Sequence, residues 1–171
     1  MERAIFLDRD GIINKNAAEQ EYITSWREFE FLPNVLECLA RAARMNYKIF
    51  VITNQRGIAR GKMSEEDVEE IHSNMINQIN DAGGRIDKIY VCPHGYGVCD
   101  CRKPLPGMLD MAKQEFNISL EASWVIGDAI SDIEMGKSRK YKTICVGKGA
   151  GIADYNVKSL REAIEIIISD S

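Results

Sequence analysis

Side chains that can ligate a metal are concentrated in one short segment of this 171-residue sequence. Three of the five cysteines and one of the two histidines lie in residues 92–101, CPHGYGVCDC, and Arg102 and Lys103 follow directly. An odd, clustered set of thiols beside an imidazole favours metal ligation over a disulfide framework. Scattered core thiols are the alternative, but a stretch rich in Gly, Pro and Asp makes a poor core.

A second set of polar groups follows short apolar runs. Each has an ordinary alternative as a turn or a helix cap. Carboxylates that gather at one place repel unless a cation joins them, and a hard, oxygen-rich site favours Mg²⁺. Together with the Thr53 hydroxyl and the charge of Lys103, these carboxylates form the set of groups that stabilises a transferring phosphoryl group. These groups are Asp8 and Asp10 after the first run, Thr53, Asn54 and Gln55 at the end of the second, and Asp128 with Asp132 after the fourth.

The elements that must position these groups alternate along the chain. Apolar runs predict buried strands at 4–8, 47–53, 86–91, 123–128 and 142–147. Helical spacing predicts helices at 33–46, 64–82, 106–116, 130–140 and from 159 onward, with capping boxes at Ser64/Asp67 and Ser159/Glu162. This alternation predicts an α/β fold with a Rossmann-like, mostly parallel sheet and helices on both faces. Ligands bind beyond the carboxyl ends of such strands, so the polar groups should share one crevice.

Composition sets the wider frame. The 22 basic and 26 acidic residues give a net charge of -4, which argues against a nucleic-acid partner. No apolar run approaches the ~20 residues that cross a membrane, and the N-terminus does not resemble a signal peptide. We therefore expect a single domain over residues 1–171, cytoplasmic and monomeric, without a membrane partner.

Four short motifs carry a resemblance to a known family. DRDGI, TN, RKP and GDAISD resemble the four motifs of the haloacid-dehalogenase-like phosphatases. Within them, FLDRDGIIN, VITNQRGIARGKM, CPHGYGVCDCRKPLPGML and VIGDAISDIEMG are similar to the D-glycero-D-manno-heptose-1,7-bisphosphate 7-phosphatases. Histidinol-phosphate phosphatases share the zinc-loop pattern. The resemblance implies a haloacid-dehalogenase-like fold, and the segment 15–31 is short enough to imply a minimal cap.

The resemblance also implies roles for individual residues. Asp8 is the nucleophile that becomes an aspartyl phosphate, and Asp10 protonates the leaving oxygen and then activates water. Mg²⁺ is held by the Asp8 carboxylate, the backbone carbonyl of Asp10 and Asp128, while Asp132 orients that shell. Thr53 and Lys103 contact the phosphoryl oxygens, and Arg102 contacts substrate.

The cysteine-rich segment is interpreted as a structural zinc loop over residues 92–101. Its ligands are Cys92, His94, Cys99 and Cys101, and Cys₃His fills the four positions of a closed zinc site. The Cys-x-His and Cys-x-Cys spacings differ from the usual C-x₂-C knuckle. The loop ends one residue before Arg102, so zinc should hold Arg102 and Lys103 over the phosphate while Mg²⁺ serves the chemistry.

The segment NQRGIARGK bears on the substrate. Arg56, Arg60 and Lys62 form a basic set around two glycines that could bind a second phosphate; a solvated basic turn is the alternative. Asn54 and Gln55 are expected to contact substrate as well, and Tyr22 and Trp26 to wall the site. His72, Cys38 and Cys145 are interpreted as structural.

We expect a Mg²⁺-dependent phosphatase that removes the 7-phosphate of D-glycero-D-manno-heptose 1,7-bisphosphate. Histidinol phosphate or another small phosphomonoester is an alternative substrate. Two other classes stay open, a metal-stabilised binding module and a phosphotransferase that passes the aspartyl phosphate to a sugar. Three features depart from the family pattern and bear on substrate and anomer preference: Ile12 in place of a common Thr, Ala129 in place of a common Lys, and a short zinc loop.

Overall fold

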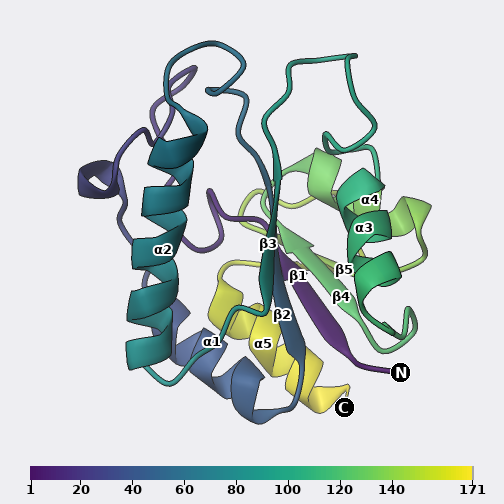
Figure 1. Cartoon of the computed structure of the whole chain (residues 1–171). Coiled ribbons are helices and arrows are strands. Elements are labelled where there is room, and N and C mark those ends of the chain that lie inside the picture. The colour runs from purple at the N-terminus through teal and green to yellow at the C-terminus, as the bar shows by residue number, and fades with distance from the viewer. Residues whose placement is uncertain (171) are drawn as a thin grey trace.

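The computed structural model describes residues 1–170 and is built around a six-stranded parallel sheet (Figure 1). Its strand order is β3-β2-β1-β4-β5-β6, and every neighbouring pair runs parallel. The strands are β1 (Ala4–Leu7), β2 (Lys48–Asn54), β3 (Lys88–Cys92), β4 (Trp124–Gly127), β5 (Lys142–Val146) and β6 (Tyr155–Val157).

Helices cover both faces of the sheet, as expected from the alternation. One face carries α1 (Val35–Arg44), α2 (Glu65–Asp81) and α5 (Leu160–Ser169), and the other carries α3 (Gly107–Glu115) and α4 (Ile130–Ser138) (Figure 1). Because side chains alternate along a strand, β1 contributes to both cores. Ile5 and Leu7 pack on the first layer, while Ala4 and Phe6 pack on the second.

The predicted elements are confirmed, with two differences. The missed strand β6 has only three residues, all exposed or half-buried, so it carries no apolar run. The capping box at Ser64 forms in both directions with Asp67. At Ser159 only half of it forms, because the Glu162 carboxylate accepts from the N–H of Lys158 instead.

The strand order creates the crevice in which the site lies. The chain passes from β1 to β2 and β3 on one side, then returns to place β4 on the other side of β1. The order therefore reverses between β1 and β4, and the carboxyl ends of these neighbours deliver Asp8 and Asp128.

The cap is minimal. Among the described residues, the only helix or strand between β1 and α1 is the 3₁₀ helix η1 (Trp26–Glu28). Trp26 stacks on Phe29, with ring centroids 4.8 Å apart, and packs against the core. The expectation that Trp26 walls the site therefore has no support in its packing.

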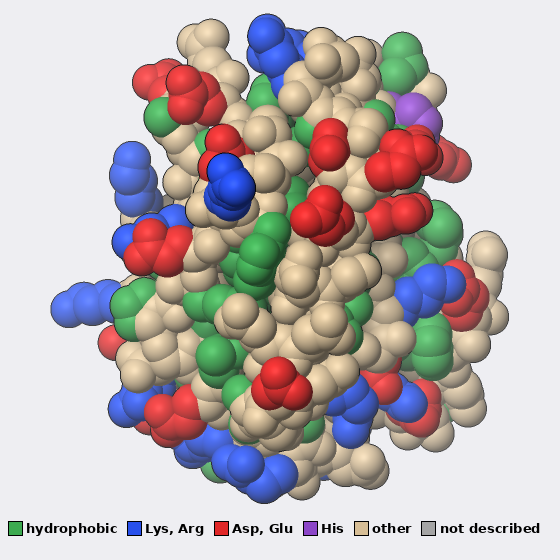
Figure 2. Space-filling model, turned by 60° about the vertical axis from the view of Figure 1, so that its left-hand side comes forward, with side chains coloured by type: hydrophobic (Ala, Val, Ile, Leu, Met, Phe, Trp, Pro, Cys, Tyr) green, Lys and Arg blue, Asp and Glu red, His purple; other side chains and the backbone are tan. Residues whose placement is uncertain are grey.

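Figure 2 shows one face of the molecule, on which acidic and basic side chains are interspersed with apolar ones. No helix within residues 1–170 combines the length and the apolarity needed to cross a bilayer.

Candidate active site and metal sites

A buried lysine joins two carboxylates at the centre of the crevice. Lys103 Nζ lies 2.8 Å from Asp8 Oδ1 and 2.7 Å from Asp132 Oδ1, and it donates to the carbonyl of Ile52 at 3.0 Å. Burial lowers the pKa of Lys103, but the charges of Asp132 and Asp8 outweigh this effect and raise the pKa above its ordinary value. Lys103 is therefore a permanent cation beside Asp8.

Asp8 itself is almost enclosed. Burial raises the pKa of Asp8 to about 8, and the neighbouring Lys103 charge opposes this rise. Its Oδ1 also accepts from the backbone N–H of Arg9 at 2.7 Å. These contacts orient the Asp8 carboxyl group, but burial still disfavours its ionised form. A bound cation would stabilise that form.

Asp10 lies in a different environment. Its Oδ1 accepts from Arg9 at 3.0 Å and from Asn14 at 2.9 Å, and its Oδ2 accepts from Gln55 at 2.9 Å. Burial raises the pKa of Asp10, but the Arg9 charge and these hydrogen bonds outweigh burial and hold the pKa below its usual value. The two carboxylates of DRD therefore differ in acidity, with Asp10 held ionised and Asp8 the more readily protonated of the two until a cation binds beside it.

The residues of the proposed Mg²⁺ site fit a hard cation. Carboxylate oxygens of Asp8, Asp128 and Asp132 lie within 4.8 Å of one another. Burial raises the pKa of Asp128, and the nearby Asp132 adds to the rise, while Asn16 donates to Asp128 Oδ2 at 3.0 Å. With Asp10, the centre holds four carboxylates beside two cations, Lys103 and Arg9, so it has an excess of negative charge that an oxygen-preferring dication would balance.

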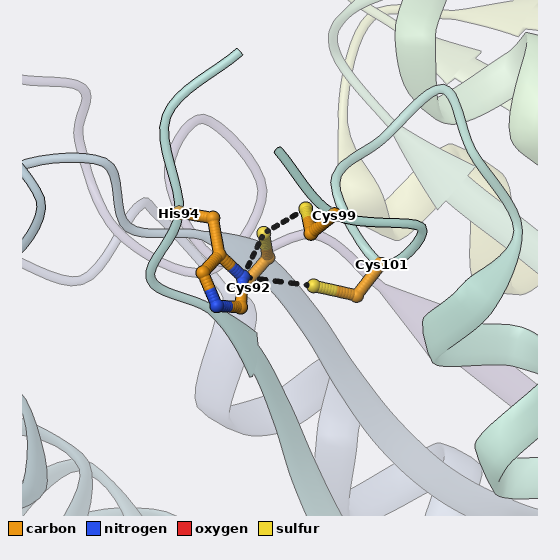
Figure 3. Close-up of side chains that lie close together, drawn as sticks. All are labelled: Cys92, His94, Cys99 and Cys101. Carbon is orange, nitrogen blue, oxygen red and sulfur yellow. Dashed lines mark hydrogen bonds between the residues drawn. The ribbon is translucent and has the colours of Figure 1, made fainter. Parts of the chain in front are cut away.

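The Cys₃His cluster also comes together (Figure 3). Cys92 Sγ lies 3.7 Å from His94 Nδ1 and 3.6 Å from Cys99 Sγ, and His94 Nδ1 lies 3.3 Å from Cys101 Sγ. A tetrahedral zinc with Zn–S near ~2.3 Å places its ligand atoms roughly 3.5–3.8 Å apart. The cysteines are free thiols, so the cluster fits a single zinc ion and not a disulfide.

The loop is anchored to the sheet beside the active site. The side-chain oxygen Oδ1 of Asn54 accepts from the backbone N–H of Lys103 at 3.1 Å, and Nδ2 of the same side chain donates to the backbone carbonyl of Lys103 at 3.3 Å. Cys92 ends β3, which pairs with β2, so Cys92 of the cluster and Asn54 lie opposite each other on adjacent strands. This brace fixes the backbone from which Lys103 reaches Asp8.

A cavity of about 510 Å³ lies beside the crevice and collects three arginines. The Tyr96 ring lies between two of them, with guanidinium carbons of Arg56 at 4.4 Å and Arg102 at 4.5 Å from its centroid. Arg60 donates to the Tyr22 hydroxyl at 3.4 Å. The cavity is lined by Gln20, Glu21, Tyr22, Asn54, Arg56, Arg60, Tyr96 and Arg102.

The predicted site residues fall into two groups. Around Asp8, the structure gathers Asp10, Lys103, Asp128 and the buried pair Thr53 and Gln55. Gln55 donates to Thr53 Oγ1 at 2.8 Å as well as to Asp10, so its amide is used inside the protein. Tyr22, Asn54, Arg56, Arg60 and Arg102 line the neighbouring cavity.

Sequence reasoning missed several contributors. Arg9, between the two aspartates of DRD, is fully buried, and Asn14 and Asn16 donate to Asp10 and Asp128. The sequence signal for all three residues was their position within nine residues of Asp8. Tyr96 was passed over in the zinc loop, although an aromatic residue between two glycines, 69% exposed here, signals a contact surface.

A parallel α/β sheet with a carboxylate pair after β1, a buried lysine and acidic side chains after β4 defines a haloacid-dehalogenase-like phosphatase. The model of the family described as Polynucleotide kinase 3 phosphatase matches residues 3–154, and the chain belongs to this family.

The matching relatives define a narrower group. D-glycero-beta-D-manno-heptose-1,7-bisphosphate 7-phosphatase of Pasteurella multocida is 38% identical over 98% of this chain and 94% of its own. D-glycero-alpha-D-manno-heptose-1,7-bisphosphate 7-phosphatase of Campylobacter jejuni is 40% identical over 83% of this chain and 80% of its own. A crystal structure of D,D-heptose 1,7-bisphosphate phosphatase from B. bronchiseptica, complexed with magnesium and phosphate, superposes with a TM-score of 0.91 at 28% identity, covering 99% of both chains. The chain belongs with these phosphatases.

Proposed function

We propose that the protein is a Mg²⁺-dependent phosphatase that removes the 7-phosphate of D-glycero-D-manno-heptose 1,7-bisphosphate. The observation that carries the reaction type is the contact of Lys103 Nζ with Asp8 at 2.8 Å, beside the Asp128 and Asp132 carboxylates. The substrate is suggested by relatives that carry this name and match most of the chain.

The residues divide the reaction between them. Asp8 attacks phosphorus through a carboxylate oxygen, and the bond to the sugar oxygen breaks as Asp10 donates its proton to that oxygen. Asp10, now a carboxylate, takes a proton from water, which attacks phosphorus and releases orthophosphate from Asp8. The lowered pKa of Asp10 suits the second step, whereas the first step requires that Asp10 take up a proton before the sugar oxygen leaves.

Charge stabilisation comes from groups that are already in place. Lys103 and the Thr53 hydroxyl neutralise and position the phosphoryl oxygens without reorganisation during the reaction. Asp8, the backbone carbonyl of Asp10 and Asp128 would hold Mg²⁺, which would supply further neutralisation of the phosphoryl charge. Asp132 holds Lys103 and accepts from the N–H of Ala129 at 3.1 Å, which orients it away from direct chemistry.

The neighbouring cavity supports a bisphosphate. Arg56 and Arg102 share the Tyr96 ring, and Arg60 lines the same cavity beside Tyr22, so three cations face one space, as a second phosphate requires. The open, minimally capped site suits a small substrate. The zinc loop is proposed as the scaffold of Arg102 and Lys103, in a cytoplasmic monomer.

One panel of substrates tests the proposal. Orthophosphate release is measured with both heptose bisphosphate anomers, histidinol phosphate, a simple sugar monophosphate and a 3′-phosphorylated oligonucleotide, the last because of the family description. We expect the highest kcat/KM with a heptose bisphosphate, dependence on Mg²⁺, and loss of turnover by several orders of magnitude in Asp8→Asn. A preference for histidinol phosphate or the oligonucleotide would overturn the substrate assignment, and full activity of folded Asp8→Asn would overturn the mechanism. Phosphate passed to a sugar instead of water would identify a transferase.

A further inference from the structure

A histidine outside the motifs is linked to the acid–base residue through one arginine. His72 lies on α2 and is only 7% exposed. Its Nε2 lies 3.2 Å from one terminal nitrogen of Arg9, and the other terminal nitrogen of Arg9 donates to Asp10 Oδ1 at 3.0 Å. One guanidinium therefore spans the gap between α2 and Asp10.

The direction of the hydrogen bond follows from the chemistry of the partners. A guanidinium has donors and no acceptor, so Nε2 of His72 must accept, and the proton of the neutral ring lies on Nδ1. Burial and the Arg9 charge lower the pKa of His72 to about 3. His72 is thus a neutral acceptor, and a protonated ring would place two cations in contact.

Arg9 depends on these two anchors. Its side chain is fully buried, and its Nε has no hydrogen-bond partner among the described residues. A buried charge is costly unless it is paired and hydrogen-bonded at its donors. Without His72, the guanidinium would be held only at the Asp10 end and would leave a buried donor unsatisfied.

We propose that His72 is a positioning residue for Asp10, because it fixes the far end of the guanidinium that orients the Asp10 carboxylate. The inference rests on the proposed acid–base role of Asp10. This role explains why a histidine occupies the position, because core packing alone would need only an apolar side chain.

The test compares two leaving groups. In His72→Leu, kcat/KM for the heptose bisphosphate should fall about 10- to 100-fold, since general acid catalysis is worth ~10²–10⁴ and depends on position. For p-nitrophenyl phosphate it should stay within about threefold, because kcat/KM covers only the steps up to departure of the first product, and the acidic phenol leaves without protonation. The apparent Mg²⁺ affinity should be unchanged.

Rescue separates hydrogen bonding from packing. His72→Gln places an amide oxygen near the position of Nε2 and should restore the sugar-phosphate reaction, whereas the shorter His72→Asn should not. If His72→Leu does not fold, the Gln and Asn pair carries the test. Met75→Ala, a buried change one turn further along α2, controls for destabilisation and should leave the ratio of the two substrates unchanged.

Asp10→Asn is measured in parallel. If Asp10→Asn turns over the heptose bisphosphate normally, the role of Asp10 fails and the inference falls with it. A defective Asp10→Asn instead keeps the role of Asp10. If His72→Leu is then normal, or if His72→Leu loses activity equally on both substrates, only the inference about His72 is overturned.

Discussion

Lys103 Nζ lies 2.8 Å from Asp8 Oδ1, although the two residues belong to distant parts of the sequence and to different structural elements. Asp8 follows a central strand, whereas Lys103 follows the Cys₃His loop and is held by Asn54 at the end of β2. Asp8, the proposed nucleophile, is therefore positioned by the sheet, and its counter-charge Lys103 is positioned by a loop whose four ligand side chains could bind a metal.

The buried Asp8 carboxyl should make Mg²⁺ binding depend on pH. Its pKa is raised to about 8, so below that pH a proton must leave before the cation binds. We expect the apparent affinity to rise by up to about tenfold per pH unit between pH 6.5 and 8 and then to level off. Isothermal titration of chelator-treated protein measures this dependence.

Stability should change in the opposite sense without the cation. A raised pKa in the folded state favours folding most at low pH, and that contribution is lost as the pH rises from about 4 towards 8. Asp8→Asn should flatten the pH dependence of the Mg²⁺ affinity and that of the unfolding free energy in this range. A wild-type Mg²⁺ affinity that is constant from pH 6.5 to 8.5 would contradict the predicted pH dependence of binding.

Gly11 tests how closely the first loop approaches the metal site. A Cβ at this position would lie 1.9 Å from Asp128 Oδ2 and 2.8 Å from Asn16 Nδ2. Gly11→Ala should therefore displace Asp128 and weaken Mg²⁺ binding by about tenfold or more, with loss of activity.

Gly83→Ala is a matched control. Gly11 and Gly83 share a left-handed backbone, with φ of +86° and +81°, but a Cβ at Gly83 meets nothing within 4 Å. Both changes should cost roughly 1–2 kcal/mol of unfolding free energy from the backbone alone. Only Gly11→Ala should change Mg²⁺ affinity; equal affinities in the two variants would argue against a close approach.

The sequence predicted the framework because its signals are local. Asp8 and Asp128 follow apolar runs whose strand character is plain, and the parallel topology then brings them together. Ser64 and Asp67 likewise form their capping box within four residues. In contrast, β6 gains its strand conformation only by pairing with β5.

Contacts across the fold could not be predicted in this way. His72 has the helical spacing of a core residue, and only the packing of α2 against the DRD turn gives it Arg9 as a partner. Gln55, which follows β2, donates to both Asp10 and Thr53, contacts that its place in a turn motif does not indicate; its contact with substrate stays a prediction. These relations depend on side-chain direction in three dimensions, which the sequence pattern does not encode.

Arg60 should distinguish bisphosphates from monophosphates. If it meets the remote phosphate, Arg60→Ala removes a charge-assisted contact worth about 1.5–3 kcal/mol, or roughly ten- to a hundredfold in kcat/KM for the bisphosphate. Turnover of a monophosphate should be nearly unchanged. Lys62→Ala is the control: this exposed residue belongs to the same basic loop but is not among the residues that line the cavity, so its loss should affect neither substrate. Equal losses on both substrates would remove Arg60 from substrate selection and favour histidinol phosphate.

Tyr96 should act on the same selectivity through its ring. Tyr96→Leu removes the surface between Arg56 and Arg102, so we expect KM for the bisphosphate to rise by about tenfold, whereas Tyr96→Phe keeps the ring and should stay close to wild type. Steady-state kinetics of both variants decides this. A Phe variant as impaired as Leu would assign the effect to the hydroxyl.

The cysteine-rich loop gives the last prediction. Cys99→Ser should reduce zinc content and thermal stability, because metal binding is coupled to folding of the loop. Mg²⁺ binding should persist, since Asp8 and Asp128 follow strands of the sheet. Activity should nevertheless fall by up to about a hundredfold, because a displacement of ~1 Å in Lys103 is enough.

Cys38→Ser is the matched control, since Cys38 is a buried thiol on α1 outside the cluster. It should lower stability without changing zinc content or the Mg²⁺-dependent activity of the folded protein. Elemental analysis should find near one zinc per chain in the wild type, the number that one Cys₃His cluster can hold. Wild-type protein that contains no zinc and is fully active with Mg²⁺ alone would show that the thiols do not position Lys103. The brace from Asn54 would then have to hold the lysine unaided.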